Sequence, residues 1–371
     1  MESAGLRNPL ELSSYIKSKV NDTDEFYIFI DEIQFCQSIP NPSLKGDFIT
    51  FYDVLNSLLI KGNLDVYITG SNSRMLSSDI LTELRGRGDE IRVFPLSFHE
   101  FYSARGGDRK EAFNEYMIFG GMPMTMTRAT AESKTDYLKR LFDETYFKDI
   151  IERRHIGKAD ALSEITDCLC SVTGSLTNVH NLADTINSAG QRRNGDRISD
   201  GTVKSYMDYL NDAFLFSEAK RYDVRGRKYF EYQSKFYCVD HGLRNARINM
   251  RKNEEPHIME NIIYNDLIMR GCNADVGVAE SYTKDSSGKT QRITREIDFV
   301  VNNGNSQCYI QSAFDMSSKE KQDSELKPFS IINDSFRKIV VTKDESIPWF
   351  DDNGILHIGI YDFLMRKDAI L

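Results

Sequence analysis

The stretch FYIFIDEIQ, which runs from Phe26 to Gln34, carries the strongest structural signal in the sequence. It places five consecutive apolar or aromatic residues directly before two adjacent carboxylates. Such a run is typical of a parallel strand that is buried on both faces. Ligands of open α/β sheets bind at the carboxyl ends of the strands. We therefore expect Asp31 and Glu32 to lie at the ligand-binding edge of a parallel sheet.

The segments that follow this strand, and the one before it, alternate between helix and strand patterns. We expect helices at residues 11–20 and 48–62, a second strand in the stretch 64–73, which ends in small polar residues, and a third strand at 90–94. This alternation predicts an α/β fold with a parallel sheet.

The residues at the ends of these strands fit nucleotide chemistry. In a nucleotide hydrolase of the P-loop type, an acid placed like Asp31 holds a magnesium ion and a neighbouring glutamate orients water. Ser71 and Asn72 follow the second strand, where a polar side chain can contact a γ-phosphate; a turn with a helix cap is the alternative. Arg87 is the candidate for an arginine finger, with Arg85 second, and a solvated surface arginine is the alternative.

The phosphate-binding half of such a site is absent from the sequence. No stretch satisfies G-x-x-x-x-G-K-S/T, the loop whose backbone N–H groups surround phosphates. The nearest match ends in Gly288, Lys289 and Thr290, but Thr283 replaces its first glycine. This segment lies between two strand-like runs, so we interpret it as a hairpin loop.

Composition limits the classes of protein that the chain can represent. The 371 residues, 40% hydrophobic and 28% charged, predict a globular protein of two or three domains. A net charge of -9 argues against coating of nucleic acid by the whole surface but leaves a local basic face open. The six cysteines have no C-x-x-C spacing, and no signal peptide or membrane-length apolar run is present. We expect a reduced, cytoplasmic protein without membrane contact.

The middle of the chain has the element order of a winged helix-turn-helix. Three short helical patterns from about residue 161 are followed by two strand-like runs around the turn DVRGR. From Gln191 to Lys228 there are nine Lys or Arg residues against six Asp or Glu. DNA contact is one interpretation, and a protein-contact module is the other, because three acids on the third helix weaken phosphate binding. The candidate DNA contacts are Arg192, Arg193, Lys204, Arg225, Arg227 and Lys228.

The last third of the chain has the layout of a restriction nuclease. Glu260 lies on an expected helix, Asp298 on a strand, and Gln311 and Ala313 on the next strand. In that layout two acids hold a metal ion and a lysine assists the nucleophile. Here Gln311 stands where the third strand of that layout carries its acid, and Ala313 stands where it carries the lysine. Magnesium should therefore bind poorly. We expect an inactive nuclease-like centre, with metal-dependent cleavage as the less favoured alternative.

In their order, these segments resemble the prokaryotic AAA-type ATPases that carry a C-terminal domain of unknown function. The resemblance covers nearly the whole chain and rests on the following stretches: FIDEIQ, YITGSNSRMLSS, Leu84 to Arg87, PLSFHEF, GGMP, KDIIERRHI, SYMDYLNDAFLF, KFYCVDHGLRNA, ENIIYNDL and REIDFVV. It implies ATP and magnesium as cofactors, Asp31 as the magnesium ligand, Glu32 as the catalytic acid, Ser71 or Asn72 as the sensor and Arg87 as the finger. It also implies an incomplete P-loop sheet core at 1–97, a helical lid at 98–160, a winged helix at 161–235 and a nuclease-like α/β domain at 236–371.

The chain departs from the family at its start. Family members carry a strand, the phosphate loop, a helix and a second strand before the segment that matches residue 1. We therefore expect a truncated ATPase that is not competent alone, with an apolar slot in its sheet and exposed strand edges that favour self-association or a partner chain. The alternative function is a non-catalytic module that binds DNA or protein.

Overall fold

The structure is a computed structural model, and it describes residues 5–70, 88–189, 197–251, 254–284, 290–304 and 306–370. The chain divides into two compact units. The first comprises Met1–Val93 with Asp212–Phe214, and the second comprises Phe94–Asn211 with Leu215–Leu371. Each unit has a hydrophobic core of its own. No helix in the described part of the chain is long and apolar enough to cross a membrane.

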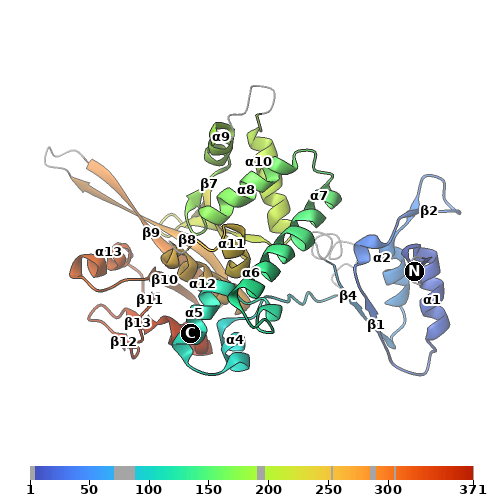
Figure 1. Cartoon of the computed structure of the whole chain (residues 1–371), viewed down its shortest axis with the longest axis horizontal. Helices are drawn as coiled ribbons and strands as arrows, with labels where there is room; N and C mark the ends of the chain where they lie inside the picture. The colour runs from blue at the N-terminus through green and yellow to red at the C-terminus, as the bar shows by residue number, and fades with distance from the viewer. Residues whose placement is uncertain are drawn as a thin grey trace. The chain divides into compact units, whose positions relative to one another are not determined.

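The first unit is a small α/β body (Figure 1). Its elements are η1 (Gly5–Arg7), α1 (Pro9–Lys19), β1 (Phe26–Ile30), η2 (Ile33–Phe35), β2 (Ile39–Pro40), β3 (Phe48–Ile49), α2 (Phe51–Leu58) and β4 (Leu64–Ile68). Asn8 caps α1 by accepting hydrogen bonds from the backbone N–H groups of Leu10 and Glu11. A capping box between Thr50 and Asp53 begins α2.

Strands β1 and β4 pair directly in parallel, from Phe26 opposite Leu64 to Ile30 opposite Ile68. No apolar slot therefore separates these two strands. One face of the pair packs on the core formed by α1, α2 and η2. That core consists of Leu12, Ile16, Ile33, Phe51, Val54, Leu55 and Leu58.

The other face of the β1–β4 pair is exposed, which corrects the expectation that the first strand is buried on both sides. Tyr27 is 63% exposed, Phe29 76% and Tyr67 39%. The rings of Phe29 and Tyr67 stack with their centroids 5.0 Å apart. The continuous apolar run does not reveal this, because a strand alternates its side chains between two faces whether or not both are covered.

The third strand expected at residues 90–94 is also wrong. This segment has no regular secondary structure, and no described strand pairs with it. Ile91 is 76% exposed and Val93 is 92% exposed. Because a strand needs a neighbour for its backbone hydrogen bonds, an apolar β-prone sequence is not sufficient to form one.

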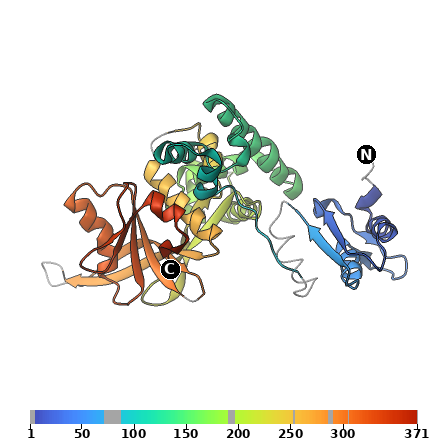
Figure 2. The same ribbon diagram turned by 90° about the horizontal axis from the view of Figure 1, so that it is seen from below.

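The second unit combines helices with a large mixed sheet (Figures 1 and 2). Its helices are α4 (Phe98–Arg105), α5 (Arg109–Phe119), η4 (Pro123–Thr125), α6 (Ala131–Arg140), the π-helical turn η5 (Leu141–Phe147), α7 (Lys148–Arg154), α8 (Ala159–Ser171), α9 (Val179–Ala189), α10 (Asp200–Asp212), α11 (His241–Arg247), α12 (Glu255–Met269), α13 (Lys319–Ser330), α14 (Ile360–Met365) and η6 (Lys367–Ile370). Its strands are β5 (Leu176–Thr177), β6 (Phe216–Asp223), β7 (Lys228–Cys238), β8 (Asn273–Lys284), β9 (Thr290–Asn302), β10 (Gln307–Ala313), β11 (Arg337–Thr342), β12 (Trp349–Phe350) and β13 (Leu356–Gly359).

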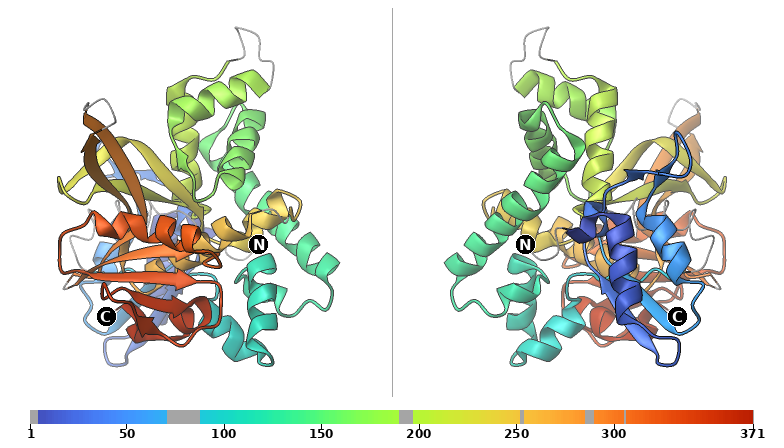
Figure 3. Two further views of the ribbon diagram at one scale, coloured as in Figure 1. Left: turned by 90° about the vertical axis from the view of Figure 1, so that its left-hand side faces the viewer. Right: turned by 90° about the vertical axis from the view of Figure 1, so that its right-hand side faces the viewer.

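All nine of these described strands belong to one sheet, in the order β12-β13-β11-β10-β9-β8-β6-β7-β5. The β6–β7 hairpin joins the rest through a short parallel pairing of Arg221–Asp223 in β6 with Val276–Val278 in β8. The sheet therefore runs continuously across residue 235, which the sequence pattern placed between two domains. The long antiparallel pair β8–β9 is prominent in Figure 3, and Gly288 and Lys289, for which the sequence predicts a hairpin loop, lie outside the described residues.

Helix α11 is fixed against α5 by close backbone contacts. Asp240 caps α11 at the N–H of Leu243 and also accepts a hydrogen bond from the N–H of Gly121. Asn245 donates to the carbonyls of two α5 residues. Gly242 lies so near the end of α5 that a Cβ on it would collide with the carbonyl of Phe119. Only glycine fits this position without a shift of backbone.

The contact at Gly242 predicts a large effect of a single methyl group. The substitution Gly242→Ala should destabilise the second unit by about 2 kcal/mol, because backbone must move to accept the new Cβ. The matched control is Gly201→Ala in the first turn of α10, where the nearest atom to a new Cβ is the Ser199 hydroxyl at 3.8 Å. This control should be neutral or slightly stabilising. Urea unfolding of both variants measures the difference, and equal stabilities would contradict the account.

Candidate functional site

The first candidate site lies at the carboxyl ends of β1 and β4. Thr69 follows β4, and its N–H donates to the carbonyl of Ile30 at 3.0 Å while its carbonyl accepts from Ile33 at 3.1 Å. The Thr69 hydroxyl donates to the carboxylate of Asp31 and accepts from the N–H of Glu32 at 3.2 Å. The structure therefore brings Asp31, Glu32 and Thr69 together at one end of the parallel pair, as the strand pattern predicts for the two acids.

Glu32 has an unusual backbone conformation. Its φ is 53° and its ψ is 54°, which is the left-handed region. Residues other than glycine rarely adopt this region, and those that do are concentrated at functional sites. The left-handed residue ends β1 and begins the 3₁₀ turn η2, so it turns the chain sharply at the point where the two acids lie.

The oxygen atoms at this site are of the kind that a hard cation binds. Asp31 is an exposed carboxylate that the Thr69 hydroxyl orients, and Mg²⁺ prefers oxygen ligands while keeping several waters. The sequence contributes no G-x-x-x-x-G-K-S/T loop for the phosphates. The other predicted members, Ser71, Asn72, Arg85 and Arg87, lie outside the described residues.

The second candidate site is a buried ion cluster in the second unit. Lys235 on β7 is 3% exposed. Its Nζ lies 2.7 Å from Glu260 on α12, 2.7 Å from Glu296 on β9 and 3.5 Å from Asp298 on β9. The hydroxyl of Tyr237 donates to the same Glu260 oxygen at 2.6 Å. The structure therefore brings together Glu260 and Asp298, two of the candidate residues from the sequence, and adds Lys235 and Glu296.

Sequence reasoning missed Lys235 and Glu296. Lys235 lies on a strand that β6 and β8 separate from β9 in the sheet, so no local spacing connects it to Asp298. Glu296 could have been predicted, because residues two apart on a strand share a face and Glu296 precedes Asp298 by two.

Burial and mutual repulsion set the electrostatics of this cluster. Burial raises the pKa of Asp298 to about 7, and Glu260 acts in the same direction. Burial also raises the pKa of Glu260, against the effect of Lys235. Burial alone would lower the pKa of Lys235, but the three carboxylates raise it above its ordinary value. The amine therefore stays protonated.

The residues around the cluster do not form a metal site. Gln311 donates to Glu325 at 3.0 Å, and Ala313 is buried beside it in β10. Among the residues that the structure describes, no group of three or more His, Cys, Asp or Glu side chains is arranged to hold a metal ion. The ammonium of Lys235 lies between the carboxylates where a cation would have to bind, so this cluster does not fit a divalent metal as it stands.

The predicted DNA-contact residues lie in different surroundings. Lys204 is exposed on α10, 3.8 Å from Asp208. Arg225 donates to the carbonyl of Ile331 at 2.6 Å. Arg227 and Lys228 are exposed at the turn between β6 and β7. Arg192 and Arg193 lie outside the described residues.

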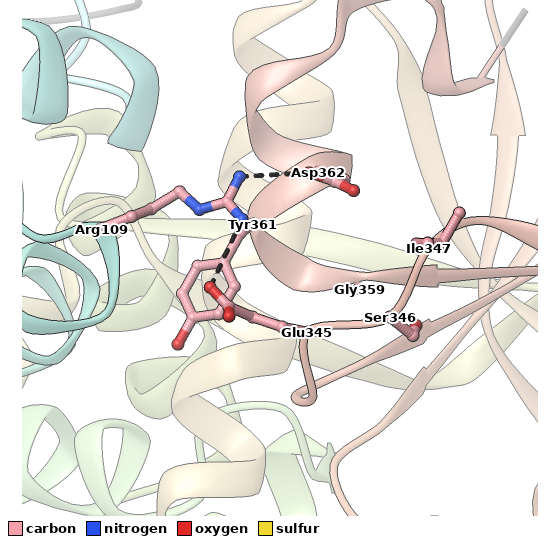
Figure 4. Close-up of a pocket in the computed structure, with 7 residues that line it drawn as sticks. All are labelled: Arg109, Glu345, Ser346, Ile347, Gly359, Tyr361 and Asp362. Atoms are coloured by element: carbon pink, nitrogen blue, oxygen red, sulfur yellow. Dashed lines mark hydrogen bonds and ion pairs between the residues drawn. The ribbon is translucent and has the colours of Figure 1, made fainter.

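A small cavity near α14 is not a candidate ligand site (Figure 4). Its volume is about 170 Å³, below the range of typical ligand pockets. Arg109 lies 3.2 Å from Asp362 and 3.4 Å from Glu345, and its guanidinium lies over the ring of Tyr361. Its charge is therefore already neutralised. The lining residues are Arg109, Glu345, Ser346, Ile347, Gly359, Tyr361 and Asp362.

Two family models match parts of the chain. Residues 2–102 match a family model described as an AAA domain, and residues 110–254 match a domain of unknown function (DUF8612). The first match contains Asp31, Glu32 and Thr69. The two matches support an AAA-type family in which an AAA-like ATPase region is followed by a domain of unknown function.

Two relatives are uncharacterized proteins. One, from Haemophilus influenzae, is 29% identical over 369 residues, which cover 97% of this chain and 83% of the relative. The other, MJ1544 from Methanocaldococcus jannaschii, is 25% identical over 324 residues, which cover 84% of this chain and 66% of the relative. Among solved structures, protein VC1899 from Vibrio cholerae aligns over 97% of this chain and 78% of its own, with 11% identity and a TM-score of 0.23.

The raised pKa of Asp298 predicts how stability depends on pH. The folded state holds the Asp298 proton more tightly than the unfolded state does, so the stability that this proton contributes is present below about pH 4 and lost as the pH rises through about 7. The substitution Asp298→Asn keeps position 298 uncharged at every pH. We expect the stability of the variant relative to wild type to rise by on the order of 2 kcal/mol from about pH 5 to about pH 8. Thermal unfolding across this range measures it, and a difference independent of pH would refute the assignment.

Proposed function

We propose that this chain is an AAA-type ATP-binding protein whose hydrolytic residues lie at the ends of β1 and β4. The observation that carries the proposal is the placement of Asp31 and Glu32 beside Thr69 at the carboxyl end of a parallel pair. The match of residues 2–102 to an AAA domain supports it independently.

The residues have separate roles in this proposal. Asp31, with the Thr69 hydroxyl beside it, would hold Mg²⁺, whose charge would offset that of the nucleotide phosphates. Glu32 accepts a proton from the attacking water or orients it, and its left-handed backbone directs the chain away from the strand end. Ser71 or Asn72 senses the γ-phosphate, and Arg87, with Arg85 second, stabilises transition-state charge as an arginine finger.

The 371 residues should bind nucleotide weakly by themselves. Backbone N–H groups and a lysine of a phosphate loop supply most of the contacts to a triphosphate, and this sequence has no such motif. Asp31 and its ion provide only part of the site. Other residues that supplied a phosphate loop would complete the nucleotide site.

The role of Asp31 predicts a specific binding result. Isothermal titration of the 371-residue chain with Mg-ATP should give a weak, magnesium-dependent signal, and Asp31→Ala should abolish the dependence on magnesium. The matched control is Asp65→Ala, an acid on the same sheet but near the start of β4, at the end opposite Asp31. Tight binding of Mg-ATP by the wild-type chain, at one site per chain and lost in Asp31→Ala, would contradict the claim that the nucleotide site lacks its phosphate-binding part.

The alternative proposal is a non-catalytic module that binds DNA. Three helices precede the β6–β7 hairpin in the winged-helix order, and the exposure of Arg227 and Lys228 at the hairpin turn favours this function. Arg225 supports it less, because its guanidinium is engaged by the carbonyl of Ile331.

DNA contact predicts a salt-dependent effect of the hairpin turn. The double substitution Arg227→Ala with Lys228→Ala should weaken duplex binding by the full chain and reduce the slope of log K against log salt by about 2. Lys110→Ala with Lys148→Ala removes two exposed charges on α5 and α7 and serves as the control. Fluorescence anisotropy at low and moderate salt measures both. Equal effects of the two pairs, or no duplex binding at low salt, would exclude this function.

A further inference from the structure

We propose that Lys235 is a built-in cation that replaces a divalent metal ion in the carboxylate centre formed by α12 and β9. The centre then requires no metal in the native protein. Removal of the ammonium would convert the three carboxylates into a divalent-cation site. The proposal is independent of the nucleotide function.

The geometry of the carboxylates favours a single cation between them. The Nζ of Lys235 is within 2.7 Å of both Glu260 and Glu296 and 3.5 Å from Asp298. The second oxygen of Asp298 accepts a hydrogen bond from the N–H of Ser312 at 2.8 Å, which orients the carboxylate. The Tyr237 hydroxyl similarly orients Glu260. Asp298 and Glu260 are therefore each oriented by a contact other than that to the lysine.

Charge and burial keep the lysine in place. Taking an ammonium out of water is costly, and only close carboxylates can offset that cost. The side chain of Lys235 is 4% exposed, and those of Glu260 and Asp298 are 11% and 12% exposed. Without a cation, up to three negative charges would face each other in this small volume. A cation is therefore an electrostatic requirement of the folded second unit, and Lys235 supplies it.

The three carboxylates offer the type of ligand atom that a hard divalent ion binds, although their present arrangement around the ammonium is not that of a metal site. Mg²⁺ and similar ions bind carboxylate oxygens at about 2.1 Å, so Glu260 and Glu296 would move inward by roughly 0.6 Å and Asp298 by roughly 1.4 Å from their present distances to Nζ. Truncation of the long lysine side chain would leave space for the ion and its remaining waters. His257 lies one turn before Glu260 on α12, and its Nδ1 has no hydrogen-bond partner among the described residues.

Wild-type protein provides the first test. In equilibrium dialysis against Mn²⁺, the full wild-type chain should bind no more metal than the Glu260→Gln variant does. The thermal unfolding of the wild-type protein should be the same in EDTA and in about 1 mM MnCl₂. Bound Mn²⁺ that is lost in Glu260→Gln, or metal-dependent DNA cleavage that is lost in the same variant, would overturn the proposal.

The variant Lys235→Ala provides the second test. Its melting temperature should fall by about 10 °C without metal, because three carboxylates lose the buried cation that they share. Mn²⁺ at about a hundred times its dissociation constant should restore about 5 °C or more. Lys343→Ala, which removes an ion pair of Lys343 with Glu255 in the same unit, should show no response to Mn²⁺.

The outcomes of the variant test are decisive in both directions. Recovery by Mn²⁺ that disappears in Lys235→Ala with Glu260→Gln and Asp298→Asn would support the proposal. A folded Lys235→Ala protein that does not respond to Mn²⁺ would overturn it. If Lys235→Ala is insoluble, refolding from urea with and without Mn²⁺ replaces the melting curve, and failure to refold at every Mn²⁺ concentration would also overturn it.

Discussion

The buried ammonium of Lys235 is the interaction on which the second unit depends. It links β7 to α12 and β9, although β7 and β9 are not neighbours in the sheet. Aromatic rings surround this link: Tyr237 stacks on Tyr264 with centroids 4.2 Å apart, and Phe299 lies against both. Apolar packing holds the layers together, and the ion cluster specifies which residues of the two sheet regions meet. Such a cluster contributes to specificity even where it adds little net stability.

The two candidate sites use carboxylates in opposite electrostatic states. Asp31 is exposed and has a neutral hydroxyl as its described partner, so it remains available to an incoming cation. Glu260 and Asp298 are buried and already share an ammonium. Acids on strands or beside them are therefore not sufficient evidence of metal chemistry. The charge that already faces them distinguishes a site that can accept an ion from one that cannot.

Local sequence patterns predicted the elements better than their burial and pairing. The run before Asp31 correctly predicts a parallel strand, and the acids at Glu260 and Asp298 were found from their places on a helix and a strand. The two-sided burial of that first strand was wrong, because Tyr27 and Phe29 are exposed. The strand expected at residues 90–94 was wrong because it has no described partner. Periodicity reports which side chains share a face, but it does not report what covers that face.

Long-range pairing explains what could not be predicted in the second unit. The parallel contact between β6 and β8 merges the hairpin with the C-terminal sheet, and nothing near Arg221 or Val276 in the sequence indicates it. Lys235 resembles an ordinary polar residue of a half-exposed strand, although it is among the most buried charged residues described. The sequence also suggested a boundary at residue 235, which lies within β7. Non-local pairing is decided by packing of the whole sheet.

The most direct test of the Lys235 account is anomalous X-ray diffraction from crystals soaked in Mn²⁺, for wild type and Lys235→Ala side by side. The account predicts no manganese peak among Glu260, Glu296 and Asp298 in the wild-type crystal and a strong peak there in the variant. A peak at that position in the wild-type crystal, or none in the variant, would show that Lys235 does not act as the cation of this centre.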